Sequence, residues 1–412
     1  MGWLHSEVNP SGQRSIWIHA VSVGEVLSAR ALIVQLKQLY PEHRILVSTT
    51  TTTGQDIARR FMSGIDATFY VPLDLTSFVN RALDRAKPEM LILIDTEIWP
   101  NLLKACHHRG VKTILLNGRL SDASYRRYQF IGRSIKGVMA NLDRVCAQTP
   151  LWGQRFINLG VLPEQVKVTG SLKYDSVSVM PDSTQVKDTN ALLKVFNFAP
   201  DVPVIIAGST TPGEEQLILN TFKRIRSSFA KCVLILAPRR PERFLEVRQI
   251  AINHGFSVAM RTDLRETTSN VEVIVLDTLG ELNQLFKVAT IVFVGGSLVD
   301  FGGHNILEPA IHGKPIIFGK HMENFLEISS LFVSQGAALQ VHSSSELEES
   351  FRVLLNDPKR CKTIGTKARS LIAKHRGACS RSLKVIVDLV PPPNVKVDSR
   401  VQGVGINLSS EA

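Results

Sequence analysis

Three acidic residues stand directly after apolar runs that predict buried strands. Glu25 follows residues 16–21 (IWIHAV) after a Ser-Val-Gly turn, and Asp95 and Glu97 follow residues 90–94 (MLILI). A carboxylate at the end of a strand can take a proton from a bound hydroxyl group, and two acids two residues apart can share a proton or orient a hydroxyl. The structural alternative is that Glu25 stabilises the first turn of the helix after it and that the pair caps the next helix.

A glycine-rich stretch at residues 291–318, IVFVGGSLVDFGGHNILEPAIHGKPIIF, is the second motif that suggests chemistry. Its first four residues predict a strand, two glycine pairs form a loop, and Asn305 and Glu308 open a short helix. Glycine lets a backbone approach a ligand closely, and a helix start offers N–H groups to a phosphate. An ordinary connection between a strand and a helix is an equal alternative, because glycine spacing alone is a weak signal.

These motifs belong to a regular alternation of strands and helices. Continuous apolar strand segments recur along residues 16–169 and again along residues 204–318, with helical segments between them. The alternation predicts an α/β protein with two doubly wound parallel sheets, whose ligands bind outside the carboxyl ends of the strands. The expected parts are an N-terminal Rossmann-like domain at 1–176, a linker at 177–200, a C-terminal Rossmann-like domain at 201–390 and a tail at 391–412.

Two longer helices are predicted from periodicity. Residues 124–144 place an apolar stripe at helical spacing: Tyr125, Tyr128, Ile131, Ile135, Val138, Met139 and Leu142. The basic residues Arg126, Arg127, Arg133 and Lys136 lie off this stripe. We expect the stripe to face the core and the basic face to be solvated, although that face is also a candidate for an anionic lipid headgroup. Residues 359–389 predict one last helix in the second domain.

The composition narrows the range of partners. A net charge of +11 and a pI near 9.5 indicate an anionic membrane or a phosphorylated substrate. Nucleic acid is not an expected partner, because the sequence has no zinc-finger spacing, RNP-like strand or Lys/Arg tract. The five cysteines are scattered without CxxC spacing, which argues against a disulfide framework or a zinc site. No HxH or HExxH spacing supports a metal, so we expect His19, His304 and His312 to be hydrogen-bonding scaffold.

Two doubly wound domains with glycine- and hydroxyl-rich loops fit a glycosyltransferase that uses a nucleotide sugar. On this interpretation the second domain holds the nucleotide, the first supplies the base, and the two face a cleft. Eight segments resemble those of the Kdo transferases: HAVSVGE (19–25), STTTTTG (48–54), DTEIWPN (95–101), NGRLS (117–121), VTGSLKYD (168–175), APRRPER (237–243), DTLGEL (277–282) and FVGGSLVDFGGHNILEPA (293–310). The resemblance extends over residues 15–385 and is specific, because the motifs occur in the family's order.

The resemblance implies a function and a set of catalytic residues. The family transfers 3-deoxy-D-manno-octulosonic acid (Kdo) from CMP-Kdo to the lipid A precursor, is similar in fold to the GT-B glycosyltransferases, inverts the anomeric centre and relies on no bound metal or cofactor. Glu25 is then the general base, and Lys173 matches the lysine that stabilises developing charge. Asp95 stands where the family has the first glutamate of its ETE-W motif, and Glu97 retains the second acid.

The resemblance also implies a donor site in the second domain. Segments that match the family's CMP site contain Pro238, Arg239, Leu279, Gly280, Glu281, Asn305, Ile306, Leu307 and Glu308. Further candidate substrate-binding positions in the strand-end loops are Ser22, Gly24, Ser209, Thr210 and Gly303. We expect Arg239 and Lys173 to neutralise the leaving phosphate, together with the helix start at Asn305. Glu308 is expected to bind ribose hydroxyls, and backbone groups of 279–281 to contact cytosine.

The expected partners are CMP-Kdo, the lipid A precursor and a membrane surface. No apolar stretch reaches the ~18–20 residues that a bilayer span needs, and the short polar N-terminus has no signal-peptide core. The family usually begins with an apolar anchor that this sequence lacks. We expect a peripheral protein at the cytoplasmic face of a membrane, and the alternatives are a truncated chain or a start at an internal methionine. Two alternatives stay open: a GT-B-like enzyme for another nucleotide sugar, including an epimerase, and an inactive nucleotide- or lipid-binding paralogue.

Overall fold

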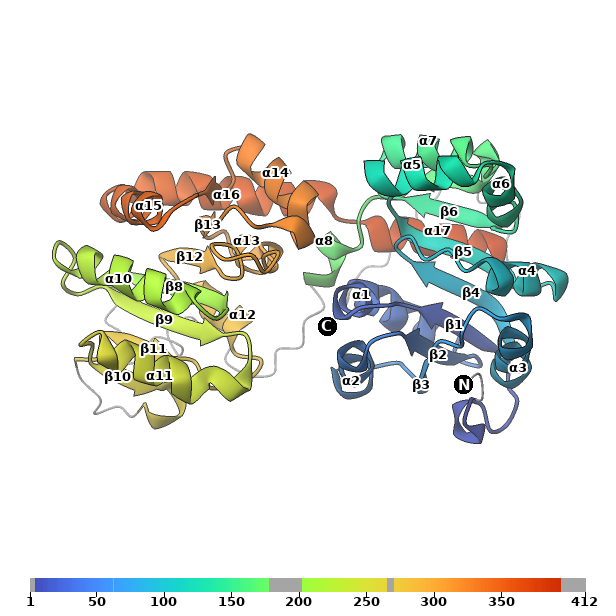
Figure 1. Cartoon of the computed structure of the whole chain (residues 1–412), viewed down its shortest axis with the longest axis horizontal. Coiled ribbons are helices and arrows are strands. Elements are labelled where there is room, and N and C mark those ends of the chain that lie inside the picture. The colour runs from blue at the N-terminus through green and yellow to red at the C-terminus, as the bar shows by residue number, and fades with distance from the viewer. Residues whose placement is uncertain (1–3, 62, 178–201, 265–269, 394–412) are drawn as a thin grey trace. The chain divides into compact units, whose positions relative to one another are not determined.

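The computed structural model describes residues 4–61, 63–177, 202–264 and 270–393. The chain forms two compact units, one made of residues 1–179 with 376–412 and the other of residues 180–375. Within the described residues, each unit contains one seven-stranded sheet, and every strand pairing in it is parallel (Figure 1). The predicted α/β class with two doubly wound parallel sheets is therefore confirmed.

The first sheet has the strand order β3-β2-β1-β4-β5-β6-β7. Its strands are β1 Ser15–His19, β2 Arg44–Thr49, β3 Ala67–Tyr70, β4 Pro88–Ile94, β5 Lys112–Gly118, β6 Arg144–Ala147 and β7 Val166–Val168. All five residues of β1 are buried, as expected for a strand covered on both faces. The strand order reverses between β1 and β4, and this switch point is where ligands bind in open parallel sheets.

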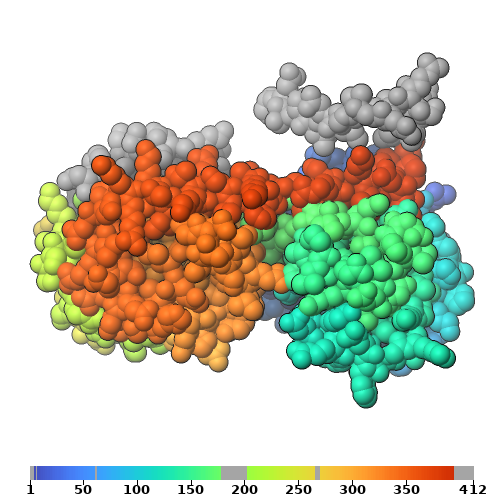
Figure 2. All heavy atoms as spheres, turned by 90° about the horizontal axis from the view of Figure 1, so that it is seen from above, coloured from blue at the N-terminus to red at the C-terminus, as the bar shows by residue number. Residues whose placement is uncertain are grey.

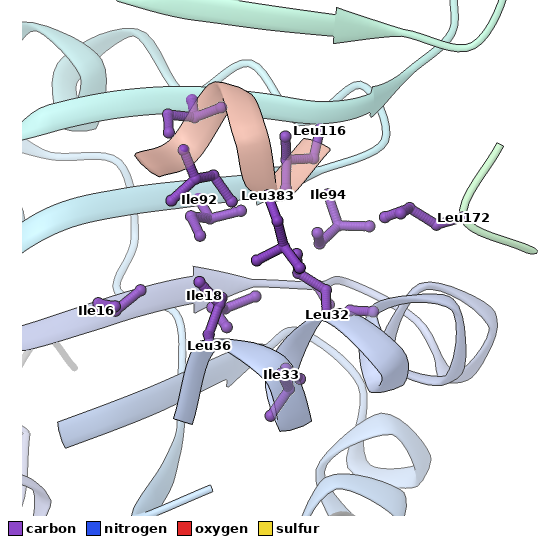
Figure 3. Close-up of a cluster of buried hydrophobic side chains, with 14 of the residues drawn as sticks. Ile16, Ile18, Leu32, Ile33, Leu36, Ile92, Ile94, Leu116, Leu172 and Leu383 are labelled. Atoms are coloured by element: carbon purple, nitrogen blue, oxygen red, sulfur yellow. The ribbon is translucent and has the colours of Figure 1, made fainter. Parts of the chain in front are cut away.

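Helices cover both faces of the first sheet. They are α1 Val23–Leu39, α2 Thr52–Phe61, α3 Thr76–Ala86, α4 Pro100–His108, α5 Asp122–Ile131, α6 Arg133–Met139, α7 Pro150–Asn158, α8 Lys173–Ser176 and α17 Ala378–Leu389. Side chains of α1 and α17 pack on one face in a single apolar cluster, which includes Leu32, Ile92 and Leu383 (Figure 3). Side chains of α3, α4, α6 and α7 pack on the opposite face in a second cluster.

The second sheet has the strand order β10-β11-β9-β8-β12-β13-β14. Its strands are β8 Val204–Thr210, β9 Val233–Pro238, β10 Val258–Met260, β11 Val273–Val275, β12 Ile291–Val294, β13 Ile316–Phe318 and β14 Leu339–Gln340. The helices of this unit are α10 Glu214–Arg226, α11 Phe244–Asn253, α12 Leu282–Leu285, α13 Leu307–Ile311, α14 Leu326–Ser334, α15 Ser344–Asn356 and α16 Pro358–His375. Here the strand order reverses between β8 and β12.

Both of the long helices predicted from periodicity are interrupted at a glycine. Gly132 has φ 64° and separates α5 from α6, and Gly377 has φ 91° and separates α16 from α17. Glycine adopts this left-handed backbone without the steric penalty that other residues meet. The apolar stripe continues across each break, so the periodicity does not reveal the change of direction.

The last helix belongs to the first unit, although residues 201–390 were expected to form the second domain. Leu383 and Ile386 of α17 lie in the same apolar cluster as strands β1 and β4. The Asp175 carboxylate accepts hydrogen bonds from the Gly377 and Cys379 backbone N–H groups at 2.7 Å each, which anchors the start of α17. Apart from residue 177, the expected linker lies outside the described residues, as does the expected tail beyond residue 393.

A bilayer span needs a long, strongly apolar helix, and none of the helices in the described ranges has that character.

Candidate functional site

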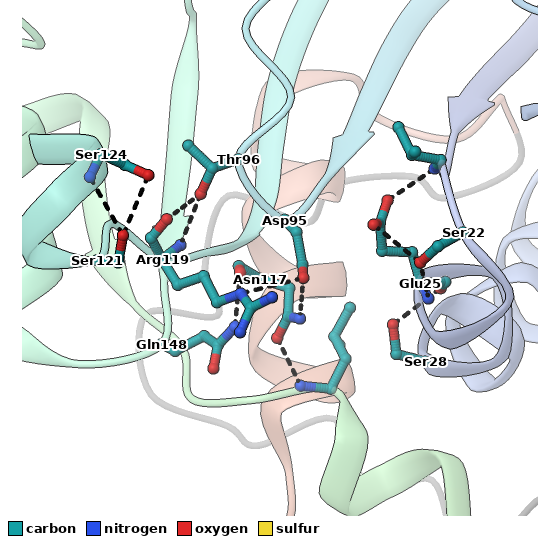
Figure 4. A network of polar contacts seen from close by, with 12 residues as sticks. Ser22, Glu25, Ser28, Asp95, Thr96, Asn117, Arg119, Ser121, Ser124 and Gln148 are labelled. Carbon is teal, nitrogen blue, oxygen red and sulfur yellow. Dashed lines mark hydrogen bonds and ion pairs between the residues drawn. The ribbon is translucent and has the colours of Figure 1, made fainter. Parts of the chain in front are cut away.

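Glu25 lies in the first turn of α1, at the carboxyl edge of the first sheet and beside its switch point. Ser22 caps this helix, because its side chain accepts from the Glu25 backbone N–H. The Ser22 hydroxyl also donates to Oε1 of Glu25 at 3.0 Å, and the Val21 backbone N–H donates to Oε2 at 2.7 Å (Figure 4). Gly24 is exposed within the same turn. The turn therefore fixes the carboxylate in one orientation.

The surroundings of Glu25 favour its protonated form. Burial is the largest of the effects that raise the pKa of Glu25 to about 7. The negative charges of Asp95 and Glu97 act in the same direction, while the hydrogen bonds from Val21 and Ser22 oppose them. The three acids that the sequence places at strand ends thus lie within electrostatic reach of one another. A carboxyl group with a pKa near 7 is suited to accept a proton from a hydroxyl at neutral pH.

Asp95 is buried in a left-handed backbone conformation, with φ 61°, directly after β4. Aspartate and asparagine adopt this conformation more readily than most other residues, so the shorter acid suits the local backbone. Its Oδ1 accepts a hydrogen bond from Nδ2 of Asn117, and its Oδ2 pairs with Nε of Arg119 at 3.3 Å (Figure 4). Asp95 is thereby tied to the end of β5.

No role is predicted from the sequence for Asn117 or Arg119, although both belong to the NGRLS segment. Asn117 has φ 58°, and its Oδ1 accepts from the Leu172 backbone N–H at 3.0 Å. An Asn-Gly pair at the end of a strand is a signal for a left-handed residue, and it could have identified this position. Lys173, half-buried, follows Leu172 and begins α8. Asn117 therefore connects the Asp95 loop with the segment that carries Lys173.

Glu97 faces an aromatic group at the same edge. Its Oε2 accepts from Nε1 of Trp99 at 3.0 Å. Burial raises the pKa of Glu97, the Trp99 hydrogen bond opposes this, and the charge of Asp95 adds to it. The Trp99 ring lies edge-on to His19, with 5.4 Å between ring centroids. Burial lowers the pKa of His19 to about 4, so this imidazole is neutral and packs between Trp99 and Ser48, whose Oγ is 2.8 Å from Nδ1.

In the second unit, Ser209 and Thr210 lie beside Pro238 and Arg239 at the carboxyl ends of β8 and β9. Thr210 pairs with Pro238 in the ladder between these strands, and the Arg239 backbone N–H donates to the Thr210 carbonyl at 3.0 Å. Ser209 has φ 57° at an irregularity in that ladder. The structure therefore brings these four candidate residues together.

The first part of the glycine loop is occupied by a side chain of the protein. The Glu214 carboxylate accepts hydrogen bonds from three successive backbone N–H groups, those of Gly296 at 2.6 Å, Ser297 at 2.9 Å and Leu298 at 2.9 Å. Runs of N–H groups like this form concave sites that bind anions. The sequence suggested a loop whose N–H groups are open to a phosphate. In the structure, three of these N–H groups already donate to Glu214.

The second part of the loop positions Asn305 and Glu308. Asn305 accepts from the Leu307 backbone N–H at 3.1 Å through Oδ1, and its Nδ2 donates to Oε1 of Glu308 at 3.2 Å. Helix α13 begins at Leu307 and has only five residues, so it supplies a small dipole. The side chains of Ile306 and Leu307 are fully buried in the core, which leaves only their backbone groups for a ligand.

Arg239 lies within electrostatic reach of this part of the loop. Burial raises the pKa of Glu308, while the Asn305 hydrogen bond and the Arg239 charge lower it. Burial lowers the pKa of His304 to about 4, and the Arg239 charge acts in the same direction. Gly303 joins the two parts of the loop, because its N–H donates to the Gly296 carbonyl at 2.8 Å. A cation, a neutral imidazole and a carboxyl group therefore come together at this edge.

Residues 279–281 form a turn after β11, and its shape is set by a clamp on Glu281. Nε and Nη2 of Arg261 contact the two Glu281 carboxylate oxygens at 3.0 and 3.1 Å, and the Thr278 hydroxyl donates to the same carboxylate at 2.6 Å. Gly280 has φ 89°, and Leu279 is exposed. These contacts engage the Glu281 side chain within the protein, whereas the Leu279 side chain stays exposed.

The predicted residues thus fall into two groups at the carboxyl edges of two sheets. The first edge carries Ser22, Gly24, Glu25, Asp95, Glu97 and Lys173, and the second carries the remaining candidates. One set of possible metal ligands occurs among the described residues, at Asp300, His321 and Glu323, with ligand atoms within 4.8 Å of one another. The Asp300 side chain is 88% exposed, and exposed acidic groups of this kind are common without a metal.

Comparisons with known proteins agree with this arrangement. The family model for 3-deoxy-D-manno-octulosonic-acid transferase (kdotransferase) matches residues 1–176. A 3-deoxy-D-manno-octulosonic acid transferase of Haemophilus influenzae is 33% identical over 380 residues, covering 92% of this chain and 87% of that protein. Its counterpart in Bordetella pertussis is 31% identical over 382 residues, covering 90% and 87%.

Solved structures show the same fold at low identity. UDP-GlcNAc 2-epimerase of Neisseria meningitidis has a TM-score of 0.62 at 14% identity, covering 91% of this chain and 100% of that chain. A glycosyltransferase of Rickettsia africae has a TM-score of 0.57 at 10% identity, covering 92% and 99%. The two Rossmann-like domains thus have the GT-B fold. From the relatives at 33% and 31% identity, the chain belongs to the 3-deoxy-D-manno-octulosonic acid transferase family.

Proposed function

We propose that this chain is an inverting glycosyltransferase that transfers Kdo from CMP-Kdo to the lipid A precursor, with Glu25 as its general base. The observation that carries the proposal is the Glu25 carboxylate, held by Val21 and Ser22 at a switch point, with a pKa of about 7. Transfer to a sugar hydroxyl requires a group that accepts the hydroxyl proton, and such a base works best with a pKa near the working pH.

In the proposed reaction, the acceptor oxygen attacks the anomeric carbon of Kdo while its proton passes to Glu25. The bond from the anomeric carbon to the phosphate oxygen breaks, and CMP leaves with the electron pair. Because one displacement replaces one bond with another on the opposite face, the anomeric centre is inverted. General base catalysis of this kind contributes ~10²–10⁴-fold to the rate.

Charged side chains have complementary roles in this reaction. The anomeric carbon gains positive charge as the bond to phosphate stretches, and the carboxylates of Asp95 and Glu97 favour that charge. Lys173 and Arg239 are assigned to the negative charge on the leaving CMP. The ion pair between Asp95 and Arg119 supports this arrangement, since it fixes the acid that shares an edge with the base.

The nucleotide is assigned to the second unit. Backbone groups of the turn at 279–281 contact cytosine, and Glu308 accepts hydrogen bonds from ribose hydroxyls. The Arg261 clamp on Glu281 supports the first assignment, because it fixes the shape of the turn. The Arg239 charge acts on both His304 and Glu308, and this supports a donor phosphate near Arg239.

The acceptor is a lipid, and we assign contact with a membrane surface to the tip between α5 and α6. Phe130 is 94% exposed and Ile131 is 47% exposed at the end of α5. Ile131 was expected to face the core, but the break at Gly132 turns it outwards.

The basic residues Arg126, Arg127, Arg133 and Lys136 are all exposed around this tip. The teal segment that holds these helices lies uncovered on the face shown in Figure 2. Apolar side chains ringed by cations suit an anionic membrane surface, which would make the protein peripheral.

The proposed function is tested by incubating the full chain with CMP-Kdo and lipid A precursor and weighing the products by mass spectrometry. We expect a product heavier by one or more Kdo residues, and we expect Glu25→Gln to lower the rate at least about 100-fold. Ser28→Ala is the matched control, because Ser28 donates only to the Glu25 backbone carbonyl.

Three outcomes contradict the proposal. Turnover of a UDP-sugar without turnover of CMP-Kdo identifies another nucleotide-sugar enzyme. Binding of CMP-Kdo with no transfer identifies an inactive paralogue. Activity of Glu25→Gln within a few-fold of wild type shows that another group is the base.

A further inference from the structure

Helix α10 begins with two acids, Glu214 and Glu215, whose side chains are fully buried. A buried carboxylate is unfavourable unless hydrogen bonds or a cation satisfy it. Glu215 is satisfied by Arg243, with Oε1 2.6 Å from Nη1. Glu214 is held by hydrogen-bond donors from two separate loops, and neither the sequence motifs nor the proposed mechanism gives it a role.

The two loops that bind Glu214 follow neighbouring strands. Its Oε2 accepts from the Thr211 backbone N–H at 3.1 Å and from the Thr211 hydroxyl at 3.0 Å, in the loop after β8. The same oxygen accepts from Gly296 at 2.6 Å, and Oε1 accepts from Ser297 and Leu298 at 2.9 Å each, in the loop after β12. One carboxylate thus joins both sides of the switch point of the second sheet.

Direct backbone contact between these loops makes the joint tight. A side chain at Gly295 would place its Cβ 2.5 Å from the Ser209 carbonyl oxygen, so glycine is required there. A Cβ at Gly296 would lie 3.0 Å from the His304 ring. The Gly303 N–H donates to the carbonyl of Gly296, the residue that Glu214 holds. An unbroken series of contacts therefore runs from Glu214 to the segment that begins at Gly303.

We propose that Glu214 is a positioning residue of the donor site: its carboxylate takes the place of a bound anion in the glycine loop and holds residues 295–305 in the form that binds the nucleotide. This inference rests on the proposed function, since it assigns Glu214 to the site proposed for CMP. Glu214 acts through Gly296 and Gly303 and does not itself contact the donor. The loop is consequently formed before any ligand binds, which lowers the ordering that binding would otherwise require.

Glutamine cannot replace this carboxylate. Glu214 accepts five hydrogen bonds and donates none, whereas the glutamine amide brings two N–H groups to a site lined with N–H donors. At least two loop N–H groups would then lack an acceptor. Aspartate retains the charge but is one methylene shorter. Its carboxylate can therefore accept from the N–H groups of one loop but reaches the two loops together less well.

The test measures CMP binding by isothermal titration calorimetry and the steady-state rates of the full-length variants Glu214→Gln and Glu214→Asp. We expect Glu214→Gln to raise the Kd for CMP and the KM for CMP-Kdo at least about tenfold, with kcat at saturating donor within about threefold of wild type. Glu214→Asp should give intermediate values and serves as the main variant if Glu214→Gln does not fold.

The matched control is Glu272→Gln, in the same unit but before β11, at the opposite edge of the sheet. Glu272 also accepts from a backbone N–H, that of Ser257, at 2.9 Å. All measurements are made at least 10 °C below the melting temperature of the least stable variant. At these temperatures, we expect Glu272→Gln to bind CMP with the same Kd as wild type.

Two results overturn the inference and are distinguishable. If wild type binds CMP and both Glu214 variants bind it with the same Kd, Glu214 supports the fold and does not position the donor loop. If wild type itself does not bind CMP, the proposed donor site is wrong, and the role of Glu214 in it falls with that site.

Discussion

Glu25 shows how burial and neighbouring charges raise the pKa of a single carboxyl group, which is the proposed general base. Val21 and Ser22 orient it, and burial with the charges of Asp95 and Glu97 raises its pKa to about 7. The orienting contacts favour the ionised form and the other effects oppose it, so the pKa reflects a balance between them. Removing one neighbouring charge should therefore change the pH at which the base becomes active.

The pH profile of the reaction tests this balance. We expect kcat/KM to fall about tenfold per pH unit below about 7 and to level off above it, because only ionised Glu25 accepts a proton. In Asp95→Asn a charge that raises the pKa is removed, so the midpoint should move to lower pH, even if the maximal rate also falls. A midpoint that stays at the wild-type pH in this variant would show that another group controls the profile.

The same carboxyl group should reduce the stability of the first unit at high pH. Glu25 has an ordinary pKa of 4.5 in the unfolded chain and a pKa of about 7 in the folded one, so the folded state binds the proton more tightly. The stabilisation that comes from this tighter proton binding is fully present below pH 4.5 and is lost as the pH rises through 7. We expect Glu25→Gln to be more stable than wild type at pH 8 by about 1–2 kcal/mol.

Differential scanning calorimetry at pH 8 and pH 5 measures this effect. The excess stability of Glu25→Gln should shrink as the pH falls, and Ser28→Ala should show no such pH dependence. If Glu25→Gln were less stable than wild type at both pH values, the lost hydrogen bonds would outweigh the pKa effect.

Sequence reasoning placed the acids at the correct edge because strand ends are local features. Apolar runs mark β1 and β4; Asp95 follows β4 directly, and Glu25 follows β1 after one short turn. The proposed role of Glu214 was not predictable in this way. Three of the N–H groups that donate to its carboxylate lie 82 to 84 residues further along the chain. No spacing rule in a single sequence connects residues that far apart.

At the scale of elements, the break between α5 and α6 lies at the tip to which membrane contact is assigned in the proposed function. A continuous helix would have kept Ile131 on the buried stripe with Ile135, whereas in the structure Ile131 is exposed beside Phe130, which lies off the stripe. We expect the double variant Phe130→Ser/Ile131→Ser to bind vesicles containing anionic phospholipid about tenfold or more weakly than wild type, because the apolar area that can enter the bilayer is lost.

A vesicle co-sedimentation series measures this affinity, with neutral phosphatidylcholine vesicles as the reference. Leu245→Ser is the matched control, since Leu245 is 71% exposed on α11 of the other unit. Equal losses in the double variant and in Leu245→Ser would refute a specific role for the α5–α6 tip. Unchanged binding in the double variant would refute it as well.

Periodicity predicted most helices and strands but not these turns. The stripe from Tyr125 to Leu142 continues in phase across Gly132, and the one in α16 and α17 continues across Gly377. A glycine within a helical pattern is tolerated at a modest cost, so its presence does not decide between a continuous and a broken helix. Tertiary packing makes that choice here.

At the scale of the whole molecule, the chain returns to its first unit at the end. The amphipathic pattern of residues 378–389 predicts a helix that packs on a sheet, but not which of the two sheets it covers. Asp175 contributes to this choice by accepting from the Gly377 and Cys379 N–H groups. Because the sequence does not reveal these hydrogen bonds, the expected domain boundary at residue 390 assigned the helix to the second domain.

Removing one acceptor at this anchor should weaken the first unit. We expect Asp175→Asn to lower the free energy of unfolding of that unit by about 1 kcal/mol, the typical effect of losing a helix cap. Urea denaturation monitored by hydrogen exchange of the first sheet measures the change. Asp388→Asn, at an exposed position of the same helix, should change it by less than about 0.5 kcal/mol. Equal effects of the two substitutions would exclude a specific anchor at Asp175.

The return of α17 to the first sheet also sets the order in which the protein can be completed on the ribosome. Residues 180–375 must be translated between the first sheet and the helix that covers one of its faces. At ~5–20 residues per second, this interval lasts roughly 10–40 s. During it, apolar side chains of the first sheet such as Ile18 and Ile92 lack part of their cover. The unit that begins first is therefore finished last, and the nascent chain presents to chaperones a surface that the mature protein hides.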